Sequence, residues 1–307
     1  MSIRVSHVHG DHIAVAAANG TEILRYVYRP DPEAFEARKP YAHPVRTLSG
    51  RTVTGYRPKD HRWHKGFQMT ASHLSGQNFW GGNCYVHGEG YLPQPERVGS
   101  MRHDGFPEFA VEDDRLAFTE ELTWVENGGA EWAREVRELV VHSVDEEAGA
   151  WAFDWSIRLT NVRDEPLVFG SPTTEGRELA GYTGLQWRGP RDFTGGTAFS
   201  PGSVAGAEKL MGSQGPWLAY TTEHDDVDGH STIVFAHAPE NLDGSAIHES
   251  HWFVRSEPFP TAAFSWAFFE EFELPPGESF AYRYRVVVAD GAWDHDGVDT
   301  YLKGLSW

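Results

Sequence analysis

Strict alternation of apolar and polar side chains is the feature that most limits the folds open to this sequence. Residues 153–160 alternate at every position, and residues 280–288 repeat the pattern. Residues 116–124 nearly follow it, but Glu120 interrupts the apolar series. Because successive side chains of a strand point to opposite faces of a sheet, this period of two predicts β-strands with one buried face.

Turn-forming pairs separate these apolar runs, among them Asn19-Gly20, Gly128-Gly129 and Pro276-Gly277. Helical periodicity is scarce: residues 299–305 predict a short helix, and residues 31–37 a single turn. Strand–helix–strand units are absent, which favours a mainly β protein with a large antiparallel β-sandwich and few short helices. No repeat or low-complexity linker divides the chain, so residues 1–307 are predicted to form a single β-sandwich domain.

The balance of acidic and basic residues limits which kinds of partner the chain can bind. The 45 Asp and Glu residues exceed the 26 Lys and Arg residues, and the formal charge of −19 repels phosphate backbones and anionic lipids. We therefore expect no nucleic acid and no membrane as a partner, and a small neutral or cationic molecule instead, while the oligomeric state stays open. Cys84 is the only cysteine, which excludes an intrachain disulfide. The N-terminal residues lack an apolar signal segment, which favours a cytoplasmic location.

A histidine motif near the N-terminus points to one alternative. His7, His9, Asp11 and His12 spell H-x-H-x-D-H, the metal-binding signature of the metallo-β-lactamase superfamily. In that superfamily the motif follows a pair of strands and opens a helix, whereas here it runs into the strand-like residues 13–15. We therefore predict a hairpin with its turn at residues 10–11. A metal-dependent hydrolase remains the alternative.

The densest group of reactive side chains lies in residues 58–80. It combines carboxylate, imidazole, ammonium and indole groups, from Asp60, His61, Trp63, His64, Lys65, His73 and Trp80. Imidazoles exchange protons near neutral pH, a carboxylate fixes their tautomer, and an ammonium group stabilises an oxyanion. His61 and His64 are three positions apart, so on a tight turn they would face the same way and could bind a metal ion. The alternative is a solvated, histidine-rich loop.

Four sequence blocks resemble the PmoA-like family, bacterial proteins of unknown function that carry a historical methane oxygenase label. The matching residues are Lys39, Pro40, Tyr41, Pro44 and Val45, then Asp60, His61, His64, Lys65 and Gly66, then Gly76, Phe79 and Trp80, and finally Gly181, Tyr182, Gly184, Leu185, Trp187 and Arg188. The chain departs from the family pattern at Trp63, where a histidine is usual. The resemblance implies a galactose mutarotase-like sandwich and an association with proteins that act on 3-keto-glycosides.

A sugar or glycoside is therefore the expected ligand, because aromatic faces stack on a pyranose while fixed polar groups bind its hydroxyls. The substrate-binding candidates are Asp60, Trp63, Trp80, Arg177, Tyr182, Trp187, Arg188 and Arg255. The expected activity is proton transfer on a sugar or keto-sugar glycoside, of the lyase, epimerase or mutarotase type. The open alternative is a carbohydrate-binding or accessory protein without turnover.

Catalytic roles follow from this hypothesis. His64 or Glu175 would act as the base, His61 as the acid, and Lys65 or Arg188 as the stabiliser of an oxyanion. No nucleotide-binding motif is present, so no nucleotide cofactor is expected. One divalent metal ion is the open cofactor alternative, with the ligands His64, His103 and Glu135.

Overall fold

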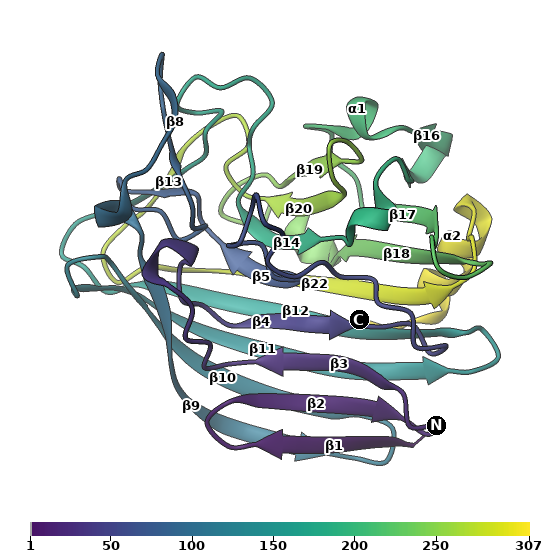
Figure 1. Ribbon diagram of the computed structural model, residues 1–307. Helices are drawn as coiled ribbons and strands as arrows, with labels where there is room; N and C mark the ends of the chain where they lie inside the picture. Colours follow the sequence, from purple (N-terminus) through teal and green to yellow (C-terminus); the bar gives the residue numbers. More distant parts are fainter. Residues whose placement is uncertain (1) are drawn as a thin grey trace.

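Two large antiparallel sheets pack face to face in the computed structural model, which describes residues 2–307 (Figure 1). The first sheet has eight strands, in the spatial order β1 (Ile3–Val8), β2 (His12–Ala17), β3 (Glu22–Val27), β4 (Tyr41–Val45), β5 (Phe67–Thr70), β14 (Gly184–Arg188), β20 (Thr261–Ser265) and β19 (His251–Arg255). The second has nine, in the order β16 (Val204–Ala205), β15 (Thr197–Ser200), β17 (Trp217–Glu223), β18 (His230–His237), β22 (Ser279–Asp290), β12 (Ala150–Asn161), β11 (Glu131–Asp145), β10 (Leu116–Val125) and β9 (Ser100–Val111).

Smaller elements complete the fold. Three short strands form a third sheet, in the order β21 (Phe272–Leu274), β13 (Leu167–Gly170) and β6 (His73–Leu74), and a hairpin joins β7 (Cys84–Val86) to β8 (Gly90–Leu92). The helices are α1 (Ala207–Leu210), α2 (His295–Gly304) and the single 3₁₀ turns η1 (Ala34–Glu36), η2 (Pro95–Arg97), η3 (Arg191–Phe193), η4 (Pro201–Ser203) and η5 (Pro239–Asn241). The predicted fold class, a mainly β antiparallel sandwich with few short helices, is confirmed.

The alternating runs form the strands that the sequence predicts. In β12 the side chains of Phe153, Trp155, Ile157 and Leu159 are buried, and in β22 the alternate residues from Phe280 to Val288 are buried likewise. In β10 the alternation continues through Glu120, whose side chain is fully buried. Glu120 is therefore a charged residue on the inner face of the sheet and not an interruption of the strand.

Aromatic side chains from the two sheets meet between them. Phe67 on β5 packs edge-on against Phe153 on β12, with ring centroids 5.2 Å apart. Further along, Phe264 on β20 lies 4.3 Å from Tyr284 on β22. Because buried aromatic pairs combine large apolar area with a preferred geometry, these contacts fix how one sheet lies on the other. They explain much of the high aromatic content.

The predicted helix and the predicted turn lie where the sequence placed them, but their first and last residues differ. Helix α2 starts at His295, four residues before the predicted 299–305 segment, because the side chain of Asp294 accepts a hydrogen bond from the Gly297 amide at 2.9 Å and caps the helix. The turn predicted at residues 31–37 is the 3₁₀ turn η1. The N-terminal histidine motif forms the predicted hairpin between β1 and β2, and His7 Nε2 lies 2.9 Å from the Tyr28 hydroxyl.

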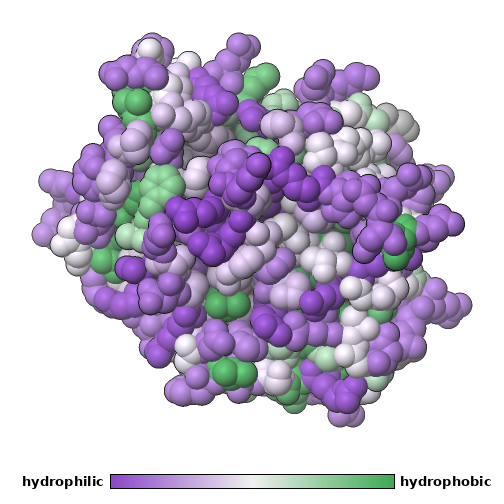
Figure 2. Space-filling model, viewed as in Figure 1, coloured by the Kyte–Doolittle hydropathy of each residue, from purple (hydrophilic) through white to green (hydrophobic). Residues whose placement is uncertain are grey.

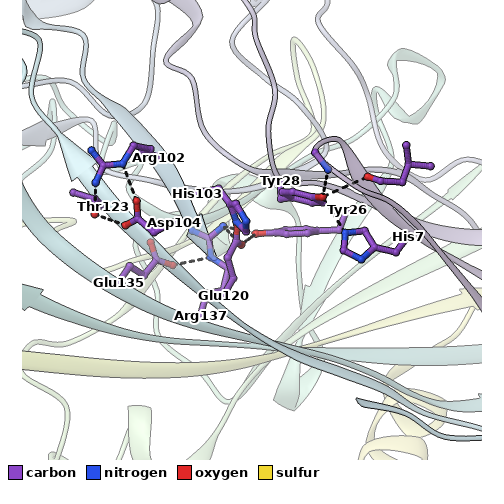
Figure 3. A network of polar contacts seen from close by, with 12 residues as sticks. His7, Tyr26, Tyr28, Arg102, His103, Asp104, Glu120, Thr123, Glu135 and Arg137 are labelled. Carbon is purple, nitrogen blue, oxygen red and sulfur yellow. Dashed lines mark hydrogen bonds and ion pairs between the residues drawn. The ribbon is translucent and has the colours of Figure 1, made fainter. Parts of the chain in front are cut away.

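A buried charge network lies between the sheets (Figure 3). The Arg137 guanidinium donates to Glu135 Oε1 at 2.7 Å and to the Tyr26 hydroxyl at 2.8 Å. Tyr26 donates in turn to Glu120, which also pairs with His103 Nδ1 at 2.7 Å. The predicted metal ligands His103 and Glu135 therefore have protein partners here. In residues 2–307 they form no close metal-binding group with His64, so the structure does not bring this predicted ligand set together.

The outer surface is mostly polar on the face shown in Figure 2, where apolar side chains are scattered in small patches. No helix in residues 2–307 is both long and apolar enough to cross a membrane.

Candidate functional site

A cavity of about 420 Å³ opens beside the loop at residues 58–66. Eight of the predicted site residues line it: Asp60, His61, Trp63, His64, Trp80, Arg177, Tyr182 and Arg255. They come from four separate parts of the sequence, and the fold brings them together. The volume lies within the range of about 300–1,000 Å³ that is usual for small-molecule sites.

A larger hollow of about 950 Å³ lies elsewhere, between residues 241–251 and residues 214–215. None of the predicted site residues lines it. The smaller cavity is the better candidate, because indole, imidazole and guanidinium groups converge there in the way that recognition and proton transfer require.

Two successive tight turns shape the loop. The His61 amide donates to the Pro58 carbonyl at 2.9 Å, and the His64 amide donates to the His61 carbonyl at 2.9 Å. The two imidazoles therefore lie side by side, with ring centroids 4.9 Å apart, as their spacing predicted. Gly66 ends the loop with a positive φ of 54°, and a Cβ there would lie 2.1 Å from the Ala42 carbonyl oxygen. Only glycine fits this approach of the loop to β4.

His64 is the deeper imidazole, with 3% of its surface exposed. Arg188 Nη1 lies 3.3 Å from His64 Nδ1, and a guanidinium can only donate, so Nδ1 is the acceptor. The proton of the neutral ring is therefore on Nε2. Burial holds the pKa of His64 well below its usual range, and the nearby charges of His61 and Arg188 lower it further. His64 is thus a neutral hydrogen-bond donor at physiological pH.

His61 is more exposed and lies next to a carboxylate. Its Nδ1 is 3.1 Å from Asp60 Oδ2, which is ion-pair distance, although the two groups are poorly aligned for a hydrogen bond. Burial lowers the pKa of His61, and Asp60 partly offsets this. Burial also raises the pKa of Asp60, but the hydrogen bond from Arg191 at 2.6 Å, a backbone hydrogen bond and the neighbouring His61 together outweigh burial, and the pKa falls to about 2. The Asp60 carboxylate is ionised and favours the His61 tautomer with Nε2 free.

Indole and phenyl rings form the apolar part of the wall. Trp80 lies edge-on to His64 with centroids 5.5 Å apart, and Phe259 lies 4.8 Å from His61. Asn78 positions Trp80, because its Oδ1 accepts hydrogen bonds from the Trp80 amide at 2.8 Å and the Gly81 amide at 2.9 Å. The Nδ2 of the same side chain lies 3.5 Å from the sulfur of Cys84, which is buried.

Two arginines and two tyrosines also line the cavity. The Tyr91 and Tyr182 hydroxyls are 2.5 Å apart, and Arg177 donates to the Tyr91 hydroxyl. The Arg177 guanidinium also lies over the Tyr91 ring, 4.7 Å from its centroid. Arg255 lies over Phe253 at 5.1 Å. Burial lowers the pKa of Arg255, and the charge of Arg177 lowers it further.

Four predicted residues do not reach the cavity wall. Lys65 is buried and pairs with Glu36 at 3.0 Å, so it points away from the cavity. Trp187 lies in the core and donates to the Val53 carbonyl at 2.9 Å. Arg188 lies just behind the wall, with its guanidinium 3.8 Å from the Phe259 ring centroid. Sequence spacing could not show these orientations, because each depends on a residue from another segment.

Glu175 is the fourth residue outside the cavity. Its Oε1 pairs with His73 Nε2 at 3.2 Å, beside a separate void of about 10 Å³. Within residues 2–307, His73, Glu175 and Glu271 form the one group of three whose donor atoms lie within 4.8 Å of one another. Imidazole and carboxylate donors suit a divalent cation such as zinc. If the protein binds such an ion, this group is better placed to hold it than the predicted set.

Sequence reasoning missed several residues of the wall, namely Gly81, Asn83, Tyr91, Phe253, Pro258, Phe259 and Thr261. Two signals pointed towards some of them. Tyr91 belongs to a long irregular segment, and such segments often carry sites on a β-scaffold. Phe253 is two residues before Arg255 on β19, so the strand period places both side chains on the same face.

The fold and site thus define a mainly β protein with a cavity lined by aromatic, histidine and arginine side chains. Residues 14–303 match the model of a family described as "Family of unknown function (DUF6807)". The chain belongs to this family, and the resemblance to the PmoA-like family is wrong, because the matching family model is a different one. No curated protein matches the sequence.

Several solved structures resemble parts of the fold. A putative kojibiose phosphorylase from human microbiome is 10% identical, over 99% of this chain and 34% of that one, with a TM-score of 0.36. A Glycoside Hydrolase Family 97 enzyme from Pseudoalteromonas sp. strain K8 is 6% identical, over 90% of this chain and 35% of that one, with a TM-score of 0.38. Galactose 1-epimerase from Lactobacillus acidophilus NCFM is 8% identical, over 94% of both chains, with a TM-score of 0.34.

This chain spans about a third of the length of the first two of these proteins. Their TM-scores and that of the epimerase are all below 0.5, so the likenesses carry no argument about the function. The function is therefore inferred from the residues of the cavity.

Proposed function

We propose that the cavity binds a sugar and that His61 and His64 move protons between its oxygen atoms, as in a mutarotase. One observation carries the proposal: two neutral imidazoles, 4.9 Å apart, face one cavity with opposite hydrogen-bonding roles. Trp63 and Trp80 offer flat apolar faces beside them, which suit stacking on a pyranose ring.

The tautomers assign the roles. His61, with Asp60 beside Nδ1, offers a lone pair on Nε2 and acts as the base that takes the proton of the anomeric hydroxyl. His64, with Arg188 at Nδ1, carries its proton on Nε2 and donates it to the ring oxygen, and the Arg188 guanidinium stabilises the imidazolate that remains until the proton returns. The bond between the anomeric carbon and the ring oxygen breaks, and the open-chain aldehyde forms. Rotation of the aldehyde and the reverse transfers close the ring as the other anomer. The roles are thus reversed from those predicted from the sequence, which made His61 the acid and His64 the base.

Proton transfer between oxygens suits this site better than removal of a carbon-bound proton. Loss of a proton next to a ketone needs strong stabilisation of the enolate. Lys65, the residue expected to give that stabilisation, is paired with the fully buried Glu36. A mutarotase reaction therefore fits the cavity better than epimerisation next to a ketone or β-elimination of a keto-glycoside.

Exchange spectroscopy by ¹H NMR tests the proposal on a panel of aldoses and the corresponding sugar acids and phosphates. The wild-type protein should speed the interconversion of anomers, and His61→Asn and His64→Asn should each slow it by about 10²–10⁴-fold. His230→Asn is the matched control, because His230 lies at the start of β18 and outside the cavity. Its rate should equal that of the wild type.

Two other results would change the conclusion. Saturable binding of a sugar without faster exchange would favour the second candidate, a sugar-binding protein without turnover. The deep burial of His64, which limits its access to a ligand, is the observation that favours this candidate. If the whole panel neither bound nor exchanged faster, the assignment of a sugar would fail.

A further inference from the structure

We propose that the ligand of this cavity carries an anionic group, a carboxylate or a phosphate, which Arg177 and Arg255 bind. The inference rests on the proposed function and narrows its substrate class to acidic sugars such as uronates or sugar phosphates. It runs against the expectation from net charge, which favoured a neutral or cationic molecule.

The two arginines lack the carboxylate partner that 12 of the 21 arginines have in the described part of the chain. Among the described residues, no carboxylate oxygen lies within 4.0 Å of the Arg177 or Arg255 guanidinium, whereas Arg57, Arg137 and Arg285 all have such partners. The chain has 45 acidic residues for 26 basic ones, so partners are plentiful. Two guanidinium groups left unpaired at the wall of one cavity therefore indicate that the missing anion comes from outside the chain.

A third guanidinium strengthens the positive potential behind the wall. Arg188 is fully buried, and its Nη2 has no hydrogen-bond partner. Its neighbours His64 and Phe259 both line the cavity. The burial of this uncompensated charge is costly unless an anion approaches it, which is what a bound carboxylate or phosphate would supply.

The single carboxylate of the cavity wall does not cancel this charge. Asp60 already accepts from Arg191 at 2.6 Å and lies 3.1 Å from His61. The wall therefore carries two positive charges, on Arg177 and Arg255, that no carboxylate of the described chain neutralises. Since the rest of the chain is strongly acidic, this cavity is a local exception to the overall charge.

The arginines are also held in place for recognition. The Arg177 guanidinium lies over the Tyr91 ring and Arg255 lies over Phe253, and stacking of this kind fixes the plane of the guanidinium. A fixed planar fork matches the paired oxygens of a carboxylate or a phosphate, and less entropy is lost when the ligand binds. The same geometry offers little advantage for a neutral hydroxyl.

Isothermal titration calorimetry with three matched ligands tests the inference: glucose, glucuronate and glucose 6-phosphate. We expect at least one of the two anionic ligands to bind about tenfold more tightly than glucose or better. The comparison of glucuronate with glucose 6-phosphate shows which anionic group the site accepts. Inorganic phosphate and acetate show how much the anion contributes alone.

Two substitutions then locate the anion site. Arg177→Met and Arg255→Met should each weaken the anionic ligand by about tenfold and change glucose binding less than twofold. Arg102→Met is the control, because this exposed arginine lies on β9, outside the cavity. Arg177 is tethered mainly through Tyr91, so its variant tests the idea even if Arg255→Met does not fold.

The outcomes separate the two proposals. Equal affinity for glucose and the anionic sugars, with no effect of either arginine substitution, would overturn the anionic preference and leave sugar binding intact. Failure of all three sugars to bind would instead overturn the proposed function. Tight binding of an anionic sugar that both substitutions weaken would support both proposals.

Discussion

Replacing Arg137 by methionine tests how strongly the buried charge network holds the two sheets together. Arg137 is fully buried, and its side chain donates to Glu135 at 2.7 Å and to Tyr26 at 2.8 Å. Glu120 lies within 4.0 Å of the same guanidinium. Methionine would fill similar space but leave the buried Glu135 without its cation and Glu120 with only His103 and Tyr26. A lost hydrogen bond to a charged group costs about 1.5–3 kcal/mol, and a broken buried ion pair costs about 3–5 kcal/mol.

We therefore expect Arg137→Met to lower the free energy of unfolding by about 3–5 kcal/mol, measured by urea denaturation with circular dichroism. Arg102→Met is the matched control, because Arg102 pairs with Asp104 and Glu131 at the surface and should cost at most about 1 kcal/mol. The double variant Arg137→Met/Glu135→Gln removes one of the stranded charges and should recover part of the loss. The reasoning would be refuted if Arg137→Met proved as mild as Arg102→Met.

Three further predictions concern the site and the core. Lys65→Met should lower the free energy of unfolding by about 1.5–3 kcal/mol in urea denaturation, because the fully buried Glu36 loses the hydrogen bond from Lys65 and keeps only Arg57; unchanged stability would contradict the ion-pair role. Burial lowers the pKa of His237 to about 3, so the unfolded chain takes up this proton first, near pH 6.5. As the pH falls from about 6 to 3, protonation of His237 in the unfolded chain should lower the free energy of unfolding by about 1.4 kcal/mol for each pH unit. Urea denaturation at several pH values measures this dependence, and His237→Leu should reduce its slope by the same amount. Gly82→Ala would place a Cβ 2.4 Å from the Trp63 ring and push the indole from its position, and the positive φ of 73° strains an alanine there. Calorimetry should therefore show weaker sugar binding, with a loss of stability of about 1–2 kcal/mol, and unchanged affinity would show that Trp63 does not contact the ligand.

The strands were predictable because their signal is local. A period of two appears in consecutive residues, and the buried faces of β12 and β22 follow it. The pairing of His61 with His64 was predictable for the same reason, since a tight turn brings residues three apart together. Glu120 was misjudged because a buried carboxylate needs partners, and its partners lie on other strands, Tyr26 on β3 and His103 on β9.

The rest of the site depends on contacts that spacing cannot reveal. Lys65 is next to His64 in the sequence, but Glu36 from η1 draws it away from the cavity. Glu175 is two residues from Arg177, but it pairs with His73 while Arg177 reaches Tyr91. The net charge of −19 is a sum over the chain, and it could not predict that two arginines without carboxylate partners would line one concave wall.

The contact between Asn78 and Cys84 gives this protein an internal reporter. Cys84 is the sole thiol of the sequence, and burial raises its pKa, so an aromatic disulfide reagent can react only when the segment opens. The amide that touches this sulfur also holds the backbone of Trp80 in the cavity wall. The rate of thiol labelling in the native protein, followed by absorbance as a ligand is added, should therefore report how often this segment of the cavity wall opens at each degree of ligand saturation.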